Sequence, residues 1–373
     1  MYVNIFFYVI LQMVTFVLCN SSYGQNDLRR FIFENKYGFI DTEGRIRIKP
    51  KFDYVSERFQ DGLAWFSNSD TAGYINPSGE IIIIFNNSKY AFNEGLSPYF
   101  DGNKLGFLTT SGENAFYPKF KNYILGSQLI SSGIPFYSEG LASVVITKND
   151  SSDWYKFIFI DKNGKKAFGN RVFASASNYF EGLAFVSLNN GEAGYINHKG
   201  KFEITLKNGE SGERFSNGFA VICDSNNRYY YINKKGLLLG KLIFEKAEAF
   251  SDSMAKVKLN GEWGFINSKG ELAIKPIYNE NSYGFSEGMA SVSISEGNDT
   301  RRSNTLTYFI NKQGEVILGP YKDMVIKSFY SGLAEGILPL KNINGNCTEY
   351  FYMNKLGHII WKDTICSIGL EDK

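Results

Sequence analysis

Histidine, cysteine and proline are scarce in this 373-residue chain, which has only 2, 4 and 8 of them. The two histidines, His198 and His358, lie far apart in the sequence, and no Cys-x-x-Cys pair or His-Glu-x-x-His helix indicates a zinc site. The phosphate-binding pattern Gly-x-x-x-x-Gly-Lys-Ser/Thr is also missing. The sequence therefore predicts a non-enzymatic protein without cofactor or metal, with a hydrolase that uses two carboxylates as a remote alternative.

Net charge and helical periodicity are missing as well. Forty basic and 38 acidic residues leave a formal charge of +2, which is too small a field to attract nucleic acid. After residue 30, no stretch shows the long apolar periodicity of 3.6 residues that is typical of a surface helix. With 16% aromatic residues, the composition favours many short strands over a helix-rich or doubly wound fold.

What the chain does contain is a repeat. Each copy has an aromatic strand, a turn of the form Asp/Asn-x-x-Gly, and a second strand. The turn glycines lie about 33 to 36 residues apart in regular copies and about 43 to 52 residues apart where loops are inserted. They are Gly44, Gly79, Gly112, Gly164, Gly200, Gly236, Gly270, Gly314 and Gly357. Such a period indicates eight or nine structural units of one kind.

The turn has a physical interpretation. Its first residue is Asp or Asn in every copy except Thr109, and the side chain is expected to accept a hydrogen bond from the backbone two residues on. The glycine at the fourth position is expected to take a positive φ. The pattern therefore predicts β-hairpins with a fixed register.

A second motif closes each copy. It consists of an aromatic residue, two polar residues and then Gly-Leu-Ala or a close variant before a third strand. In six copies the residue before the glycine is acidic, namely Asp61, Glu94, Glu139, Glu181, Asp252 and Glu287. We expect these carboxylates to accept hydrogen bonds from local backbone N–H groups. A ladder that binds cations or a basic ligand is the alternative.

These motifs resemble those of the WG-repeat family. The clearest copy begins at Trp263-Gly264, continues through Pro276 and ends at Phe285 to Val292, and the resemblance extends over about residues 36–361. The Trp is replaced in every other copy, for example by Tyr37. The resemblance implies an interaction or envelope-associated repeat protein without shared catalytic residues.

We expect an all-β fold of tandem hairpin repeats over residues 36–361, preceded by a lead-in (25–35) and followed by a tail (362–373). A regular copy offers three strands, whereas a closed propeller blade needs about four. The sequence therefore favours an open superhelical, solenoid-like array, in which each unit contacts only its neighbours. A closed β-propeller is the alternative.

The amino terminus resembles a secretory signal peptide. Residues 1–19 are apolar apart from Asn4, Gln12 and Thr15, and small residues precede a cleavage site after Gly24. We therefore expect residues 1–24 to be removed and the mature chain, without a transmembrane span, to be periplasmic or extracellular. An uncleaved anchor and a lipid anchor at Cys19 are alternatives, the latter disfavoured because Leu18 stands where a small residue is expected.

Three cysteines remain in the mature chain. Cys223 lies in an apolar strand and is interpreted as a packed free thiol. Cys347 and Cys366 flank the last hairpin and can form a disulfide in an oxidising compartment.

The predicted partner is a macromolecule, with another protein preferred over an envelope glycan. Lysines concentrate in the hairpin turns and form a candidate basic edge, while four aromatic residues offer candidate stacking surfaces for a sugar. The candidate interaction residues are Trp263, Tyr37, Tyr195, Tyr229, Lys199, Lys234, Lys235, Lys269 and Lys312. Together these features predict an exported protein-binding scaffold at the cell envelope, with a carbohydrate-binding array as the alternative.

Overall fold

The structure, a computed structural model, describes residues 28–86, 88–102, 104–121, 134–146, 156–295, 305–342 and 345–367. The predicted signal peptide and Cys19 lie outside these residues. The described residues contain strands and turns but no helix, as the sequence predicts. Accordingly, this part of the chain has no helix of the length and apolar character needed to span a membrane.

The strands form nine small antiparallel sheets, here numbered 1 to 9 in chain order. Sheets 2, 5, 7 and 9 have four strands. Their strands are β4 (Tyr54–Val55), β5 (Ala64–Asn68), β6 (Thr71–Ile75) and β7 (Ile81–Ile84); β14 (Ser175–Ala176), β15 (Ala184–Ser187), β16 (Ala193–Ile196) and β17 (Phe202–Thr205); β21 (Lys246–Ala247), β22 (Met254–Leu259), β23 (Glu262–Asn267) and β24 (Leu272–Tyr278); and β28 (Val325–Ile326), β29 (Leu333–Asn342), β30 (Gly345–Asn354) and β31 (Ile359–Ser367).

Sheets 1, 3, 4, 6 and 8 have three strands. Their strands are β1 (Arg29–Phe33), β2 (Lys36–Ile40) and β3 (Ile46–Phe52); β8 (Leu96–Asp101), β9 (Lys104–Thr109) and β10 (Asn114–Lys121); β11 (Tyr137–Ser138), β12 (Leu141–Ile146) and β13 (Lys156–Asp161); β18 (Ser211–Gly212), β19 (Phe219–Cys223) and β20 (Tyr229–Asn233); and β25 (Ala290–Ser295), β26 (Thr305–Ile310) and β27 (Val316–Lys322).

The predicted hairpin turns are confirmed. All nine turn glycines have a φ between 68° and 86°. In the clearest copy, the Oδ1 atom of Asn267 accepts hydrogen bonds from the backbone N–H groups of Lys269 (2.9 Å) and Glu271 (3.1 Å). In the copy that has Thr109 in place of Asp or Asn, the threonine hydroxyl accepts a hydrogen bond from the backbone N–H of Glu113 at 3.1 Å. The turn residues therefore fix the local backbone, as expected.

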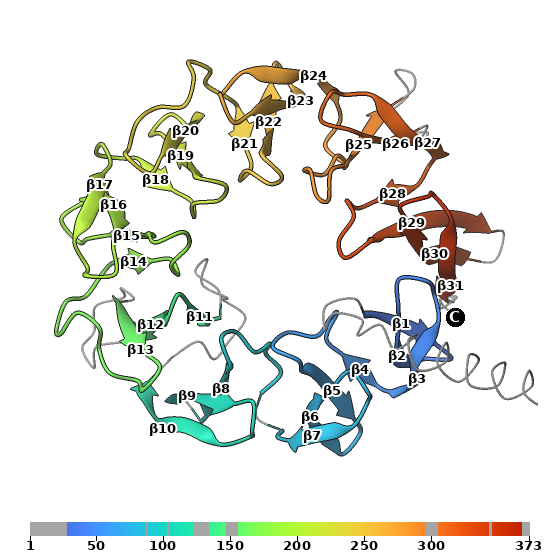
Figure 1. Cartoon of the computed structure of the whole chain (residues 1–373), viewed down its shortest axis with the longest axis horizontal. Coiled ribbons are helices and arrows are strands. Elements are labelled where there is room, and N and C mark those ends of the chain that lie inside the picture. The colour runs from blue at the N-terminus through green and yellow to red at the C-terminus, as the bar shows by residue number, and fades with distance from the viewer. Residues whose placement is uncertain are drawn as a thin grey trace, which may run out of the picture.

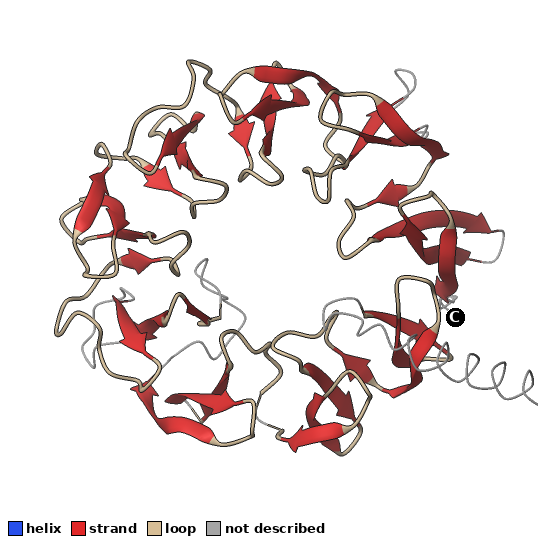
Figure 2. Ribbon diagram, viewed as in Figure 1, coloured by secondary structure: helices blue, strands red, loops and turns tan. Residues whose placement is uncertain are grey.

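The nine sheets stand side by side in a ring around a central opening (Figures 1 and 2). The open array expected from the sequence is therefore wrong, and the propeller-like alternative describes the arrangement. No described sheet closes on itself. Instead, sheet 9 packs against sheet 1 through a cluster that contains Phe31, Ile40, Leu333 and Tyr352. The ring of Phe31 meets that of Trp361 at 5.8 Å.

The expectation failed because sheet boundaries fall inside the sequence repeat. Strand β22, which follows one Gly-Leu-Ala-type motif, pairs with β23 of the next copy from Met254 opposite Asn267 to Leu259 opposite Glu262. The fourth strand, β21, has only two residues, which pair with Lys258 and Val257. Two residues are too few to show an alternating pattern. Counting strands within one copy therefore underestimates the strands of the four-stranded sheets 2, 5, 7 and 9.

The core lies between neighbouring sheets. In sheets 1 to 8, the aromatic residue two positions before the Asp, Asn or Thr of the Asp/Asn-x-x-Gly-type turn meets the aromatic residue that precedes the next two-residue hairpin turn, with ring centroids 4.7 to 5.2 Å apart. Such offset or edge-to-face pairs are favourable beyond their buried area. The eight pairs are Phe39–Phe59, Tyr74–Phe92, Phe107–Tyr137, Phe159–Tyr179, Tyr195–Phe215, Tyr231–Phe250, Phe265–Phe285 and Phe309–Phe329.

Candidate binding site at the seam of the ring

The recurrent acidic residues lie in two-residue hairpin turns near the central opening. Asp61 and Gly62 have φ values of 48° and 79°, and the flanking residues Gln60 and Leu63 exchange both backbone hydrogen bonds. Two consecutive positive φ values are typical of a type I′ turn. Ser253 takes the same conformation with a φ of 65°, although it has a side chain.

The acidic side chains accept hydrogen bonds from the next sheet, not from the backbone of their own turns. Each side chain in this position from Asp61 to Glu287 accepts a hydrogen bond from the backbone of the corresponding turn in the next sheet, so the expectation of local acceptors is wrong. These links run in order from sheet 2 to sheet 9. The donor N–H groups and acceptors are Gly95 to Asp61 (2.7 Å), Gly140 to Glu94 (3.0 Å), Gly182 to Glu139 (3.0 Å), Gly218 to Glu181 (3.0 Å), Ser253 to Asn217 (2.8 Å), Gly288 to Asp252 (2.7 Å) and Gly332 to Glu287 (3.0 Å).

Each of the four glutamates also pairs with a basic side chain of the next sheet. The partners are Lys162 for Glu94 (3.2 Å), His198 for Glu139 (3.2 Å), Lys234 for Glu181 (3.1 Å) and Lys355 for Glu287 (2.9 Å). Burial raises the pKa of Glu94, but the hydrogen bonds from Gly140 and Lys162 outweigh it and hold that pKa below its usual value. These carboxylates therefore already have partners, and the described residues hold no acidic cluster fit for a metal ion.

The candidate basic edge is only partly free. Lys234 pairs with Glu181. Lys199, Lys235 and Lys269 are exposed, while Lys312 is half-buried. These lysines thus surround the turns without converging on one described cavity.

The candidate stacking aromatics are mostly inside the protein. Tyr195 is fully buried and donates its hydroxyl proton to the carbonyl of Glu213 at 2.7 Å. Trp263 is only 3% exposed, and its indole N–H donates to Glu280 at 2.8 Å while Lys256 lies 4.2 Å from its ring centroid. The expectation that these two are exposed is wrong. Tyr37 and Tyr229 are half-buried.

The cysteines are placed as follows. Cys347 and Cys366 face each other on β30 and β31 and form a disulfide with an S–S distance of 2.01 Å. Cys223 is a free, half-buried thiol. The disulfide thus joins the last two strands of the sheet that completes the ring.

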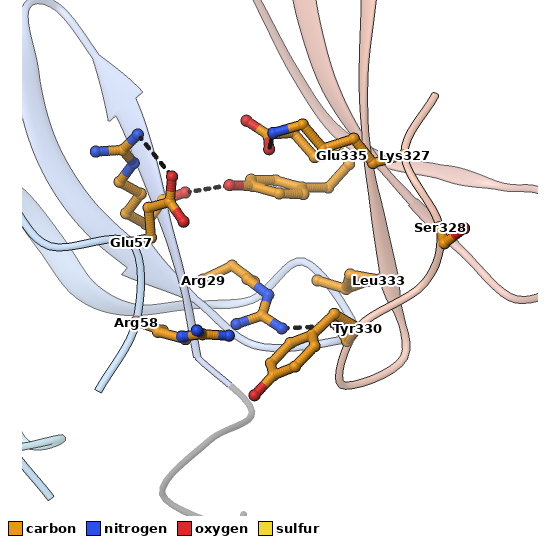
Figure 3. A pocket seen from close by; sticks show the side chains of 10 residues that line it. Arg29, Glu57, Arg58, Lys327, Ser328, Tyr330, Leu333 and Glu335 are labelled. Carbon is orange, nitrogen blue, oxygen red and sulfur yellow. Dashed lines mark hydrogen bonds and ion pairs between the residues drawn. The ribbon is translucent and has the colours of Figure 1, made fainter. Parts of the chain in front are cut away.

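A cavity of about 250 Å³ lies at the seam, where sheet 9 meets sheets 1 and 2 (Figure 3). Basic side chains come from both sides of it: Arg29 from β1, Arg58 from the segment between β4 and β5, and Lys327 from the segment after β28. Tyr330 forms part of the wall and is 46% exposed. The seam is therefore both the ring closure and a cationic site.

Tyr330 holds two guanidinium groups. The guanidinium carbons of Arg29 and Arg58 lie 4.6 and 4.8 Å from its ring centroid, within the range of a cation–π contact. Arg29 also donates to the carbonyl oxygen of Tyr330 at 2.7 Å. The elements involved are β1, the β4–β5 segment and the turn before β29, which only ring closure brings together.

A second cavity, of about 380 Å³, continues from the seam toward the central opening. It shares Arg58 and Tyr330 with the seam cavity and is lined further by residues of the hairpin turns in sheets 2 to 5, including Phe136 and Phe180. The rings of Phe136 and Phe180 meet at 6.4 Å. Basic, aromatic and amide side chains, together with the carboxylates of Asp61 and Glu94, thus form one connected surface.

The sequence offered one sign of this site. The position directly after the aromatic residue of the second motif is serine in four copies, but it is Phe180 in one and Tyr330 in another. Arg58 and Arg214 likewise occupy equivalent positions, and Arg214 lies 4.7 Å from the Phe180 ring centroid. Arg29 could not be found in this way because it precedes the first copy.

The comparisons with known proteins concern the repeat and the fold. The WG containing repeat family matches residues 37–70, 231–263 and 263–296. These three segments are WG containing repeats. The predicted resemblance is thereby confirmed, and the third WG containing repeat is the copy that begins at Trp263. No curated protein matches the chain.

Among solved structures, a crystal structure of the eukaryotic initiation factor is 10% identical and has a TM-score of 0.59 over 91% of this chain and 96% of that chain. This likeness concerns the fold alone. BamB from Moraxella catarrhalis is 10% identical (94% and 97% covered, TM-score 0.40), and AztD from Citrobacter koseri is 12% identical (78% and 93% covered, TM-score 0.41).

Proposed function

We propose that this protein is an exported, non-enzymatic scaffold at the cell envelope that binds another protein through the seam and the adjoining central surface. The observation that carries the proposal is Tyr330, which is 46% exposed and stands at a repeat position that is serine in four copies. Arg29 and Arg58 flank its ring. Tyrosine and arginine are the residue types that, with tryptophan, most often dominate binding at protein interfaces.

Export rests on the apolar segment at residues 1–19 and the cleavage site after Gly24. The disulfide between Cys347 and Cys366 supports it, because disulfides persist in oxidising compartments. Cell fractionation with amino-terminal sequencing tests it. A mature chain that begins at Gln25 outside the cytoplasm is expected, and retention of the full chain in the cytoplasm contradicts export.

The absence of catalysis is part of the proposal. Gly284-Phe285-Ser286-Glu287-Gly288 has the spacing of a hydrolase nucleophile elbow, which requires a strand-to-helix turn. Here Ser286 instead exchanges backbone hydrogen bonds with Met289 across a β-hairpin. His198 stacks on Tyr179 and pairs with Glu139, so it is engaged elsewhere.

A glycan-binding array is the weaker alternative. Two of its four expected stacking residues, Tyr195 and Trp263, are buried. The half-exposed ring of Tyr330 is already in contact with two guanidinium groups, which leaves less of it for a sugar. A protein partner whose acidic side chains meet these arginines fits the surface better.

The test is in-cell photo-cross-linking with a photoreactive residue placed at position 330, followed by mass spectrometry. The control position is Ile84 on the outer strand β7, which is 67% exposed. We expect one protein to be captured from position 330 and not from position 84, and to be lost when Arg58→Ala is added. Equal capture from both positions contradicts the proposal. Specific binding on a glycan array without a protein partner favours the alternative.

A further inference from the structure

The seam cavity carries an excess of positive charge. Four cationic side chains line it, Arg29, Arg30, Arg58 and Lys327, against two carboxylates, Glu57 and Glu335. Both carboxylates already have partners. Glu335 lies 2.7 Å from Lys327, and Glu57 lies 3.7 Å from Arg30 (Figure 3). Neither Arg29 nor Arg58 forms an ion pair with a carboxylate among the described residues, and Glu287 is the carboxylate that acts on Arg29 from farther away.

Arg29 is an unusual member of this group. It is only 8% exposed, and its one described hydrogen bond goes to an uncharged carbonyl oxygen of Tyr330. Burial lowers the pKa of Arg29 and the nearby charge of Arg58 acts in the same direction, while Tyr352, Tyr330 and Glu287 oppose this shift without cancelling it. A buried charge without a directly paired counter-charge is costly, and a second cation beside it increases that cost. An anion bound between the two guanidinium groups would offset both the cost of burying Arg29 and the repulsion between Arg29 and Arg58.

The geometry is prepared for such a ligand. Tyr330 contacts both guanidinium groups with its ring, so their positions are fixed before any ligand arrives. Guanidinium groups present planar N–H donors that suit carboxylate and phosphate oxygens. The cavity volume of about 250 Å³ is several times the roughly 30 Å³ that one water occupies in the liquid, so a small organic anion fits.

We propose that the seam cavity binds a dianionic oxyanion, either a phosphoryl group or a dicarboxylate, between Arg29 and Arg58. The inference shares the seam with the proposed function but does not depend on a protein partner, because the ligand can be a free ion or a group on a larger molecule. Since the cavity is built from sheet 9 and sheets 1 and 2, the bound anion joins the two ends of the ring. A ligand that binds only the folded ring also stabilises it.

The experiment measures thermal unfolding and calorimetric titration of the mature full chain with inorganic phosphate and with malonate, at ionic strength matched by chloride. We expect one of the two dianions to raise the midpoint of unfolding. The variant Arg58→Gln should weaken that binding roughly ten- to hundredfold, since it removes a charged hydrogen-bond donor. Tighter binding of phosphate indicates that the natural ligand carries a phosphoryl group. Tighter binding of malonate indicates a dicarboxylate.

Arg214→Gln is the matched control, because Arg214 has the repeat position of Arg58 and a similar ring contact but does not line the seam cavity. It should bind the ion like the wild type. Arg29→Gln should abolish binding, and if that variant unfolds, the half-buried Arg58 still provides the test. Absence of binding by both ions, or an equal response in Arg58→Gln and Arg214→Gln, overturns the inference. Neither result bears on protein capture at position 330.

Discussion

Ring closure can be tested with a double-mutant cycle on Phe31 and Trp361. Phe31 belongs to the first strand and Trp361 to the last, yet their rings lie 5.8 Å apart at an interplanar angle of 71°. Phe31 is 4% exposed. A closed ring therefore predicts an energetic coupling between two residues that an open array would hold at opposite ends.

The magnitude follows from the contacts. Truncation of a buried phenylalanine to alanine costs about 3 to 5 kcal/mol, because buried area is lost and a cavity remains. An edge-to-face aromatic pair adds about 0.5 to 1.5 kcal/mol beyond buried area. We expect Phe31→Ala to destabilise the protein by about 3 kcal/mol or more. The coupling energy with Trp361→Ala should be about 0.5 to 1.5 kcal/mol.

The assay is urea unfolding of the wild type, the two single variants and the double variant, followed by circular dichroism. The control cycle uses Phe39 and Phe59, whose rings are 4.8 Å apart in consecutive sheets. Those two residues are coupled whether or not the ring closes. Coupling in the control cycle together with additivity of Phe31→Ala and Trp361→Ala would refute the closed ring.

Three further outcomes are expected. Ser253→Gly should stabilise the protein by about 0.5 to 1 kcal/mol in urea unfolding. It removes the strain of a non-glycine residue in the left-handed conformation (φ 65°), and this gain exceeds the entropy that glycine adds to the unfolded chain. Destabilisation by this substitution contradicts the prediction. Reduction of the disulfide between Cys347 and Cys366, 19 residues apart, should cost about 3 kcal/mol, and identical unfolding curves with and without reductant would argue against it. The hydrogen bond from Trp263 and the pair with Lys258 lower the pKa of Glu280 to about 2, so its ionised form stabilises the fold above the ordinary pKa of 4.5 and this contribution is lost as the pH falls toward 2. The stability difference between wild type and Glu280→Gln should shrink over that pH range, whereas a constant difference would contradict the pairing.

The hairpins were predictable because their causes are local. Asn267 accepts hydrogen bonds from residues two and four positions ahead, and Gly270 takes its φ of 77° within the same turn. Such contacts depend only on residues close in sequence. The number of units and the all-β class followed from the recurrence of these turns.

The acidic residues show where local reasoning stops. Asp252 lies in its turn, where a local hydrogen-bond acceptor would also lie, but its carboxylate accepts a hydrogen bond from the N–H group of Gly288, 36 residues away. Nothing in one copy distinguishes these two possibilities. Whether the carboxylate meets a donor in its own turn or in the next sheet depends on how the two sheets are oriented to each other. That orientation is set by packing between the sheets.

By itself, then, the sequence determined the turn geometry and the repeat, since each is dictated within one copy. Tertiary structure decided the closure of the ring and the composition of the seam. Arg29, Arg58 and Tyr330 come from three distant segments, and Arg29 lies before the first copy of the repeat. They meet because nine sheets, each turned slightly against the last, bring the final strand back to the first. That accumulated rotation is a property of the whole array, and no single copy encodes it.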